Sequence, residues 1–235
     1  MKKFTLCVLF AMGAMCVANA QDKAVSLGLR AGLNVNTLTY SGNNEAEIRD
    51  LYKSHTGFHI GAVVNCKVAG NFYLQPGLYF TTRGAKMEET GTEGEYKYSL
   101  TEKINMNYLQ IPISASYRFP VGKIVKIDIN VGPYVAVGLG GRVKEEATIR
   151  YNGMSESENL SYDVFGKSTD DENRGDFKRF DAGLRFGAGV HISKFNIGLI
   201  YDLGLANLAH TGDNAWNRGT KFRNGSFLVS VGYNF

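Results

Sequence analysis

The sequence contains few residues whose types and spacing could support catalysis, and histidine is the first type to consider. A histidine beside a hydroxyl or a carboxylate can act as a general base in hydrolysis. Ser193 follows His191 by two residues, and Asp213 follows His210 by three. A tight turn and a solvated loop explain these two groupings more simply, so we expect no enzymatic activity and no catalytic residues. The histidines are His55, His59, His191 and His210.

Acidic residues could instead bind a metal ion. Asp170-Asp171-Glu172-Asn173 and the nearby Asp176 offer carboxylate oxygens, which divalent cations prefer, but their spacing matches no calcium-binding loop. The sequence has no glycine-rich phosphate loop and no His/Cys ligand cluster, so we expect neither a metal nor a cofactor. A net charge of +4 is too small to indicate a nucleic-acid partner.

The first 20 residues have the composition of a targeting signal. Lys2 and Lys3 precede an uncharged apolar stretch, 4–17, which is too short to span a bilayer as a helix. Ala18-Asn19-Ala20 then supplies the small-residue pattern that signal peptidase cleaves. We therefore expect residues 1–20 to be a cleaved signal peptide, with Ala18 and Ala20 at its cleavage site, and residues 21–235 to form one domain.

Eight later segments alternate apolar and polar residues with a period of two, the pattern of β-strands that have two different faces. In the first segment, Leu27, Leu29 and Leu33 share one face, whereas Arg30 and Asn34 share the other. The segments are 25–36, 57–65, 72–81, 108–119, 127–139, 180–190, 195–204 and 226–235.

The connections between these segments alternate strictly between short and long. The short ones are 67–71, 120–125 and 193–194, and the long polar ones are 41–55, 85–104, 141–176 and 206–221. A soluble sandwich with crossover connections would not sort its loops in this way. An up-and-down transmembrane barrel does, with short turns in the periplasm and long loops outside the cell. The sequence therefore predicts an all-β, antiparallel outer-membrane β-barrel of eight strands with both termini in the periplasm.

The side chains expected on the two faces agree with a membrane position. Phe72, Phe119, Phe195 and Phe235 lie on the apolar face near the short turns, where an interfacial aromatic girdle is expected. This face would contact outer-membrane lipid and lipopolysaccharide. Long inward residues would fill a lumen of eight strands, which favours a closed or nearly closed barrel over a diffusion pore.

Pairing the segments about their short turns predicts the register. A two-residue turn at 193–194 places Arg185 opposite Asp202, and a turn centred on Lys123 places Arg118 opposite Asp128. Opposed residues have Cβ atoms about 4.5–5.5 Å apart, which is close enough for a charge-assisted pair. We expect both pairs to be structural and to help fill the lumen.

The chain ends Val231-Gly232-Tyr233-Asn234-Phe235, with alternating apolar residues and a terminal Phe. Val231, Tyr233 and Phe235 resemble the C-terminal signal that directs outer-membrane barrels to their insertion machinery. Several other stretches resemble the PorT-type outer-membrane β-barrel family: Leu74-Gln75-Pro76-Gly77-Leu78-Tyr79-Phe80, Arg83-Gly84, Tyr108-Leu109-Gln110-Ile111-Pro112-Ile113, Gly132-Pro133-Tyr134, Phe180-Asp181-Ala182-Gly183 and Gly187-Ala188-Gly189-Val190. The resemblance spans the chain after residue 20 and implies the barrel fold and an outer-membrane location.

Three functions are compatible with these observations. The favoured one is a non-enzymatic barrel whose extracellular loops bind an unknown ligand or protein in recognition, adhesion or scaffolding, because specific function tends to reside in loops. A small-solute channel is the first alternative. An accessory role in protein secretion is implied only by the resemblance to the PorT-type family.

Overall fold

The computed structural model describes residues 25–42, 52–152, 154–165, 177–209 and 221–235. The predicted signal peptide, with Ala18 and Ala20, lies outside these residues, as do the acidic run 170–173, His210 and Asp213. The described chain forms nine strands: β1 (Val25–Ser41), β2 (Tyr52–Ala69), β3 (Phe72–Glu93), β4 (Tyr96–Val121), β5 (Val125–Tyr151), β6 (Met154–Asp163), β7 (Phe180–Ile192), β8 (Phe195–Gly204) and β9 (Lys221–Asn234).

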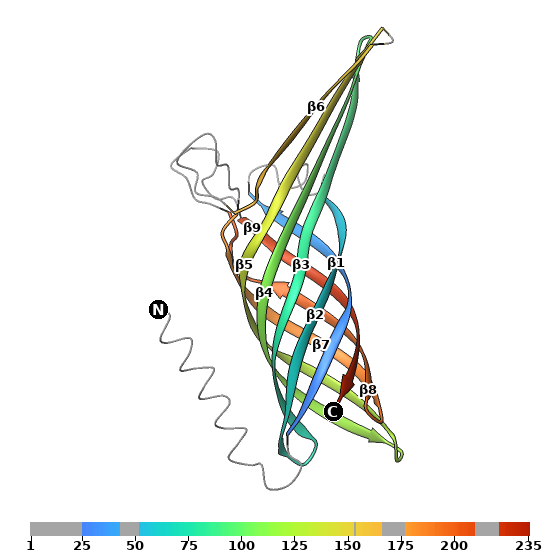
Figure 1. Ribbon diagram of the computed structural model, residues 1–235, viewed down its shortest axis with the longest axis vertical. Coiled ribbons are helices and arrows are strands. Elements are labelled where there is room, and N and C mark those ends of the chain that lie inside the picture. The colour runs from blue at the N-terminus through green and yellow to red at the C-terminus, as the bar shows by residue number, and fades with distance from the viewer. Residues whose placement is uncertain (1–24, 43–51, 153, 166–176, 210–220) are drawn as a thin grey trace.

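Eight of these strands close into a ring, as Figure 1 shows. The order around the ring is β1, β2, β3, β4, β5, β7, β8 and β9, and β9 pairs with β1 to complete it. Every pairing is antiparallel, so neighbours in the ring run up and down in turn. The predicted eight-stranded up-and-down barrel is therefore confirmed. Among the described residues, no helix has the length and hydropathy needed to cross a bilayer.

Alternation of side chains produces the two faces of the barrel wall. In β1, Leu29 and Leu33 are about half exposed on the outside, whereas Arg30 and Asn34 are buried in the lumen. Since the side chains of a strand point alternately to opposite sides, this pattern follows from the sequence period of two. The wall therefore has an apolar outside and a polar inside, the reverse of a soluble barrel.

The short turns lie together at one end of the barrel, where β9 also ends (Figure 1). Gly122 and Ser193 adopt positive φ angles of 81° and 56° in two of these turns, as tight hairpins often require. Aromatic side chains pack in pairs on the outside at this end, consistent with a girdle. Ring centroids are 4.8 Å apart for Phe72 and Tyr117 and 5.3 Å apart for Phe195 and Tyr233.

The opposite end differs from the prediction. Residues 85–104 and most of 141–163 were expected to be loops, but β3, β4 and β5 continue through them and β6 pairs with the outer half of β5. These four strands form a sheet that projects beyond the barrel (Figure 1). The prediction was wrong because a polar stretch can form a strand as well as a loop. A strand outside the bilayer does not need a lipid-facing apolar side.

Candidate functional site

A cluster of four charges fills the middle of the lumen. Arg185 Nε and Nη2 donate to the two carboxylate oxygens of Asp202, at 2.7 and 2.8 Å. Arg83 from β3 binds the same carboxylate at 3.1 Å and also pairs with Asp181 of β7. None of these four side chains is more than 5% exposed. Two cations and two anions thus balance each other where no solvent screens them.

Neighbouring polar groups surround this cluster. Gln110 Nε2 donates to Asp202 at 3.0 Å, and Asn224 Nδ2 donates to Asp181 at 3.0 Å. The Arg83 guanidinium lies over the ring of Tyr134, 5.0 Å from its centroid. A buried ion cluster is tolerated when its members also receive hydrogen bonds, so this network fixes which strands meet across the lumen.

The predicted register at this level is correct, because Arg185 is opposite Asp202 across β7 and β8. Arg83 was not predicted as a site residue, because it lies beyond the predicted third segment 72–81, and Asp181 lies in the predicted segment 180–190 but was given no partner. Extending the alternation of the third segment by one more step would have placed Arg83 on the inward face with Tyr79 and Thr81.

The second predicted pair has the expected register but not the expected contact. Arg118 is opposite Asp128 across β4 and β5. Its guanidinium instead donates to Asn65 Oδ1 at 2.6 Å and lies over the ring of Tyr73, 3.9 Å from its centroid. Asp128 lies 3.0 Å from His191 Nε2. A long arginine side chain can reach a different strand across the lumen. The residue opposite it in the strand register is therefore not always its hydrogen-bond partner.

His191 lies near the short turns, as predicted, but it belongs to β7 and is buried. Its Nε2 also lies 3.3 Å from the Asn196 amide nitrogen. Within the described part of the chain, no hydroxyl group is hydrogen-bonded to His191. The His191-Ile192-Ser193 sequence therefore forms no nucleophile–base pair here.

His59 makes the contacts that a catalytic histidine would make. Its Nδ1 lies 2.6 Å from Asn34 Oδ1, and its Nε2 lies 3.1 Å from Ser230 Oγ. Because Asn34 Nδ2 donates to the carbonyl of Phe58 and to Thr81 Oγ1, Asn34 Oδ1 is the acceptor and His59 carries its proton on Nδ1. His59 Nε2 then accepts from the Ser230 hydroxyl. This arrangement was not predicted from the sequence, because its members come from β1, β2 and β9.

The surroundings of this trio favour a structural role. Asn34, His59 and Ser230 are at most 2% exposed. Ser230 borders a cavity of about 50 Å³, enough for a few water molecules but far smaller than the ~300–1,000 Å³ of small-molecule sites. Gly32 is paired with both His59 and Ser230, and a Cβ there would lie 2.7 Å from His59 Cε1. The barrel is therefore packed tightly around the histidine, with no room for an acyl substrate.

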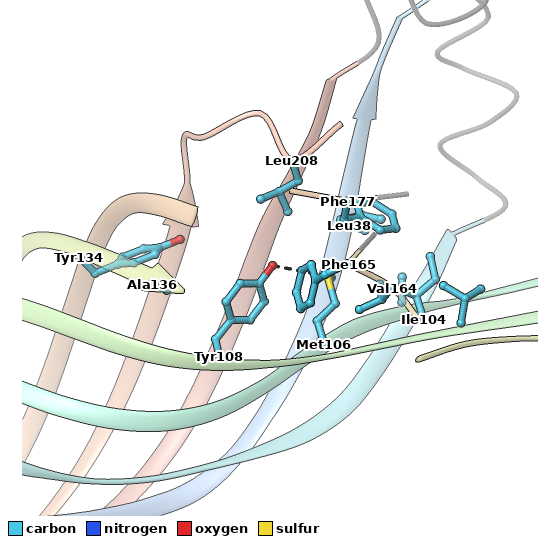
Figure 2. Packing of buried hydrophobic residues seen from close by; sticks show 12 residues of the cluster. Leu38, Ile104, Met106, Tyr108, Tyr134, Ala136, Val164, Phe165, Phe177 and Leu208 are labelled. Carbon is cyan, nitrogen blue, oxygen red and sulfur yellow. Dashed lines mark hydrogen bonds between the residues drawn. The ribbon is translucent and has the colours of Figure 1, made fainter. Parts of the chain in front are cut away.

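An apolar plug closes the outer mouth of the lumen. Figure 2 shows Leu38, Ile104, Met106 and Tyr108 from the strands packed against residues that follow β6 and β8. The ring of Phe165 meets that of Tyr108 edge to face, with centroids 5.7 Å apart. The plug side chains beyond the strands are Val164, Phe165, Phe177 and Leu208, each at most 5% exposed. The charge cluster and the plug together support a closed lumen.

The projecting sheet has two chemically different faces. One continues the lumen-facing side and carries Tyr98, Ile149 and Leu160, each 41–54% exposed, beside Glu156 and Glu158. Tyr96 and Tyr151 stack on this face, with centroids 4.3 Å apart. The other face carries lysines, serines and threonines together with Glu88 and Glu146. We call these the inner and the outer face of the sheet.

Comparisons with known proteins agree with the barrel. A family model described as an outer membrane protein beta-barrel domain matches residues 19–210. No curated protein matches the chain.

Similar solved structures include an attachment invasion locus protein, a surface protein and a channel. The attachment invasion locus protein Ail of Yersinia pestis is 13% identical, with a TM-score of 0.35, covering 89% of this chain and 98% of that one. Neisserial surface protein A is 14% identical, with a TM-score of 0.38, covering 91% and 100%. An outer membrane channel from Pseudomonas putida F1 is 10% identical, with a TM-score of 0.30, covering 92% and 97%.

Proposed function

Since this chain belongs to the family of outer membrane protein beta-barrel domains, and is thus an integral outer-membrane protein, we propose that it is a non-enzymatic recognition or adhesion protein. The observation that carries this proposal is the four-stranded sheet of β3, β4, β5 and β6, which projects from a barrel whose lumen is filled. A pore would need an open lumen and has no need of such a sheet.

The inner face of the sheet offers a surface for another protein. Aromatic and aliphatic side chains lie exposed there among glutamates, so the face is apolar and negatively charged at once. Exposed apolar patches on stable proteins mark interaction sites, and aromatic residues are enriched in such interfaces. The complementary partner is an extracellular protein surface that presents basic and apolar side chains.

The sequence features at the two ends of the chain fit the same proposal. We propose that residues 1–20 are a signal peptide cleaved after Ala20, that residues 21–235 are the barrel domain, and that Val231, Tyr233 and Phe235 guide assembly by the insertion machinery. Membership of the PorT-type group within the family, with an accessory role in secretion, is the narrower alternative. N-terminal sequencing of the membrane-inserted protein should begin at Gln21, and a retained Met1 would contradict the cleavage.

Photo-cross-linking on intact cells tests the recognition role. A photoreactive amino acid replaces Tyr98 on the inner face or, as the control, Ser99 on the outer face of the same strand. We expect cross-links to an extracellular protein from position 98 and not from position 99, identified by mass spectrometry. Equal cross-linking from both positions, or none from position 98, would contradict the use of the inner face.

Planar-bilayer recording tests the channel alternative. The filled lumen predicts no stable single-channel conductance for the whole protein. A variant in which Phe165 and Phe177 are replaced by Ser should lose the plug, whereas the charge cluster below it remains. Steady conductance by the unaltered protein would favour the solute channel.

A further inference from the structure

Four lysines form one row across the outer side of the barrel rim. In the register of the sheet, Lys53 of β2 is opposite Lys86 of β3, Lys86 is opposite Lys103 of β4, and Lys103 is opposite Lys144 of β5. The residues next to them along the strands, Ala85, Ile104 and Val143, are buried toward the lumen. The lysines therefore point to the outside, with neighbouring Cβ atoms about 4.5–5.5 Å apart.

The two halves of this lysine row differ in their counter-charges. Glu88 lies 2.8 Å from Lys53 and also pairs with Lys86. Lys103 and Lys144 are exposed, and no carboxylate of the described residues lies within ion-pair distance of either ammonium group. Like charges directly opposite each other destabilise a sheet, so the Lys103–Lys144 half is the one that an external anion would stabilise.

Groups suited to an anion surround these two lysines. A shallow hollow over β4, β5 and β6 is lined on the outer face by Lys103 and Lys144 together with Thr101, Asn159 and Ser161, whose hydroxyl and amide groups can donate hydrogen bonds. Glu145 and Glu146 also line the hollow, so the site holds two cations and two carboxylates, and the Glu145 carboxylate already accepts a hydrogen bond from the Tyr162 hydroxyl. One row closer to the barrel, Arg142 is opposite Asn105 of β4 and Asp163 of β6, so this row adds one cation and one carboxylate.

The lysine row lies just beyond the lipid-facing band. The last exposed apolar residues on the same side are Phe58, Leu109 and Leu139, five or six residues nearer the barrel centre than Lys53, Lys103 and Lys144. At ~3.3 Å per residue and a strand tilt of ~45°, this separation is roughly 12–14 Å along the membrane normal. The ammonium groups thus lie at the height of lipid headgroups and on the side of the wall that faces them.

We propose that Lys103 and Lys144 bind a phosphate group on the headgroup of an outer-leaflet glycolipid of the lipopolysaccharide class. The hollow supplies two point charges and several hydrogen-bond donors, a combination that suits a phosphate. Its place above the apolar band favours a lipid-borne phosphate over a free one. The inference uses the membrane position of the barrel and does not depend on the recognition role of the inner face.

The test uses the whole protein, refolded in lipid nanodiscs, and bisphosphorylated lipid A as the probe. Binding is measured by native mass spectrometry and by titration. We expect K103Q/K144Q to weaken binding about tenfold and added salt to weaken it further. The matched control is K97Q/R150Q, because Lys97 and Arg150 are opposite each other on the same strands and face but farther from the membrane. It should change affinity less than about twofold.

Two further binding measurements test the proposal, one on the E88Q variant and one with dephosphorylated lipid A. E88Q frees Lys53 and Lys86 from their carboxylate and should tighten binding a few-fold, so the proposal can be judged even if K103Q/K144Q fails to fold. Dephosphorylated lipid A should bind far more weakly than the bisphosphorylated form. Equal binding of both forms, an equal loss in the control variant, or displacement of the lipid by equimolar inorganic phosphate would overturn the lipid-phosphate site.

Discussion

Removing one charge from the lumen cluster should destabilise the barrel by an amount that depends on which charge is removed. Asp202 accepts hydrogen bonds from Arg185, Arg83 and Gln110. Arg185, in contrast, has Asp202 as its only ion-pair partner among the described residues. D202N therefore leaves the Arg185 guanidinium buried without an anion, at a cost of about 3–5 kcal/mol. R185M leaves Asp202 with two partners, and we expect a loss of about 1–3 kcal/mol.

The double variant R185M/D202N removes both charges and should be less destabilised than the sum of the single variants. The expected coupling is about 1–3 kcal/mol, measured by equilibrium urea unfolding in detergent or lipid and followed by circular dichroism and by gel mobility of unboiled samples. R118M is the control, because the Arg118 guanidinium contacts an amide and a ring and its removal orphans no carboxylate. Additive losses, or a larger loss in R185M than in D202N, would refute this account of the cluster.

The remaining predictions concern assembly, topology, reactivity and pH. F235D should lower the amount of heat-modifiable protein in the outer membrane, because a charge then lies in the aromatic girdle and the terminal signal is lost; normal levels would count against the signal. A cysteine at Ser157 should react with an impermeant maleimide on intact cells, whereas one at Gly70 should react only after the outer membrane is permeabilised; the reverse pattern would invert the barrel. A fluorophosphonate probe should not label Ser230, because no substrate-sized space adjoins it, so labelling that is lost in S230A would restore the enzyme hypothesis. Lys53 and Lys86 lower the pKa of Glu88 to about 2, so the stabilisation from these ion pairs is present above pH ~4.5 and is lost as the pH falls toward 2. An NMR titration of Glu88 checks this, and a midpoint that K53M does not raise would contradict the cause.

The alternation of single segments was enough to predict the ring of eight strands, since each membrane-crossing strand has one apolar and one polar face. The same rule failed for residues 85–104 and 141–163, where the strands continue beyond the lipid and the sequence has no lipid-facing side to reveal a strand. Arg185 and Asp202 could be paired from a two-residue turn, because both side chains are held at neighbouring positions.

Contacts across the lumen could not be predicted in this way. The bond from Arg118 to Asn65 joins strands that are not adjacent in the ring, and Arg83 reaches Asp181 across the barrel interior. Such partners depend on the barrel diameter, on the stagger of the strands and on how far a long side chain extends. The trio of Asn34, His59 and Ser230 likewise requires knowing that the last strand closes against the first.

The projecting sheet also determines how the protein would carry a mechanical load. Its strands β3, β4 and β5 are the strands of the barrel wall, so no hinge or linker separates the part outside the membrane from the part within it. A pull on the tip turns at Gly94 and Asn152 acts along the strands, and the backbone hydrogen bonds that join them run perpendicular to that direction. These bonds would be loaded together in shear rather than opened one after another. Tension at the tip would therefore be spread along the full length of the ladder and into the bilayer-embedded wall.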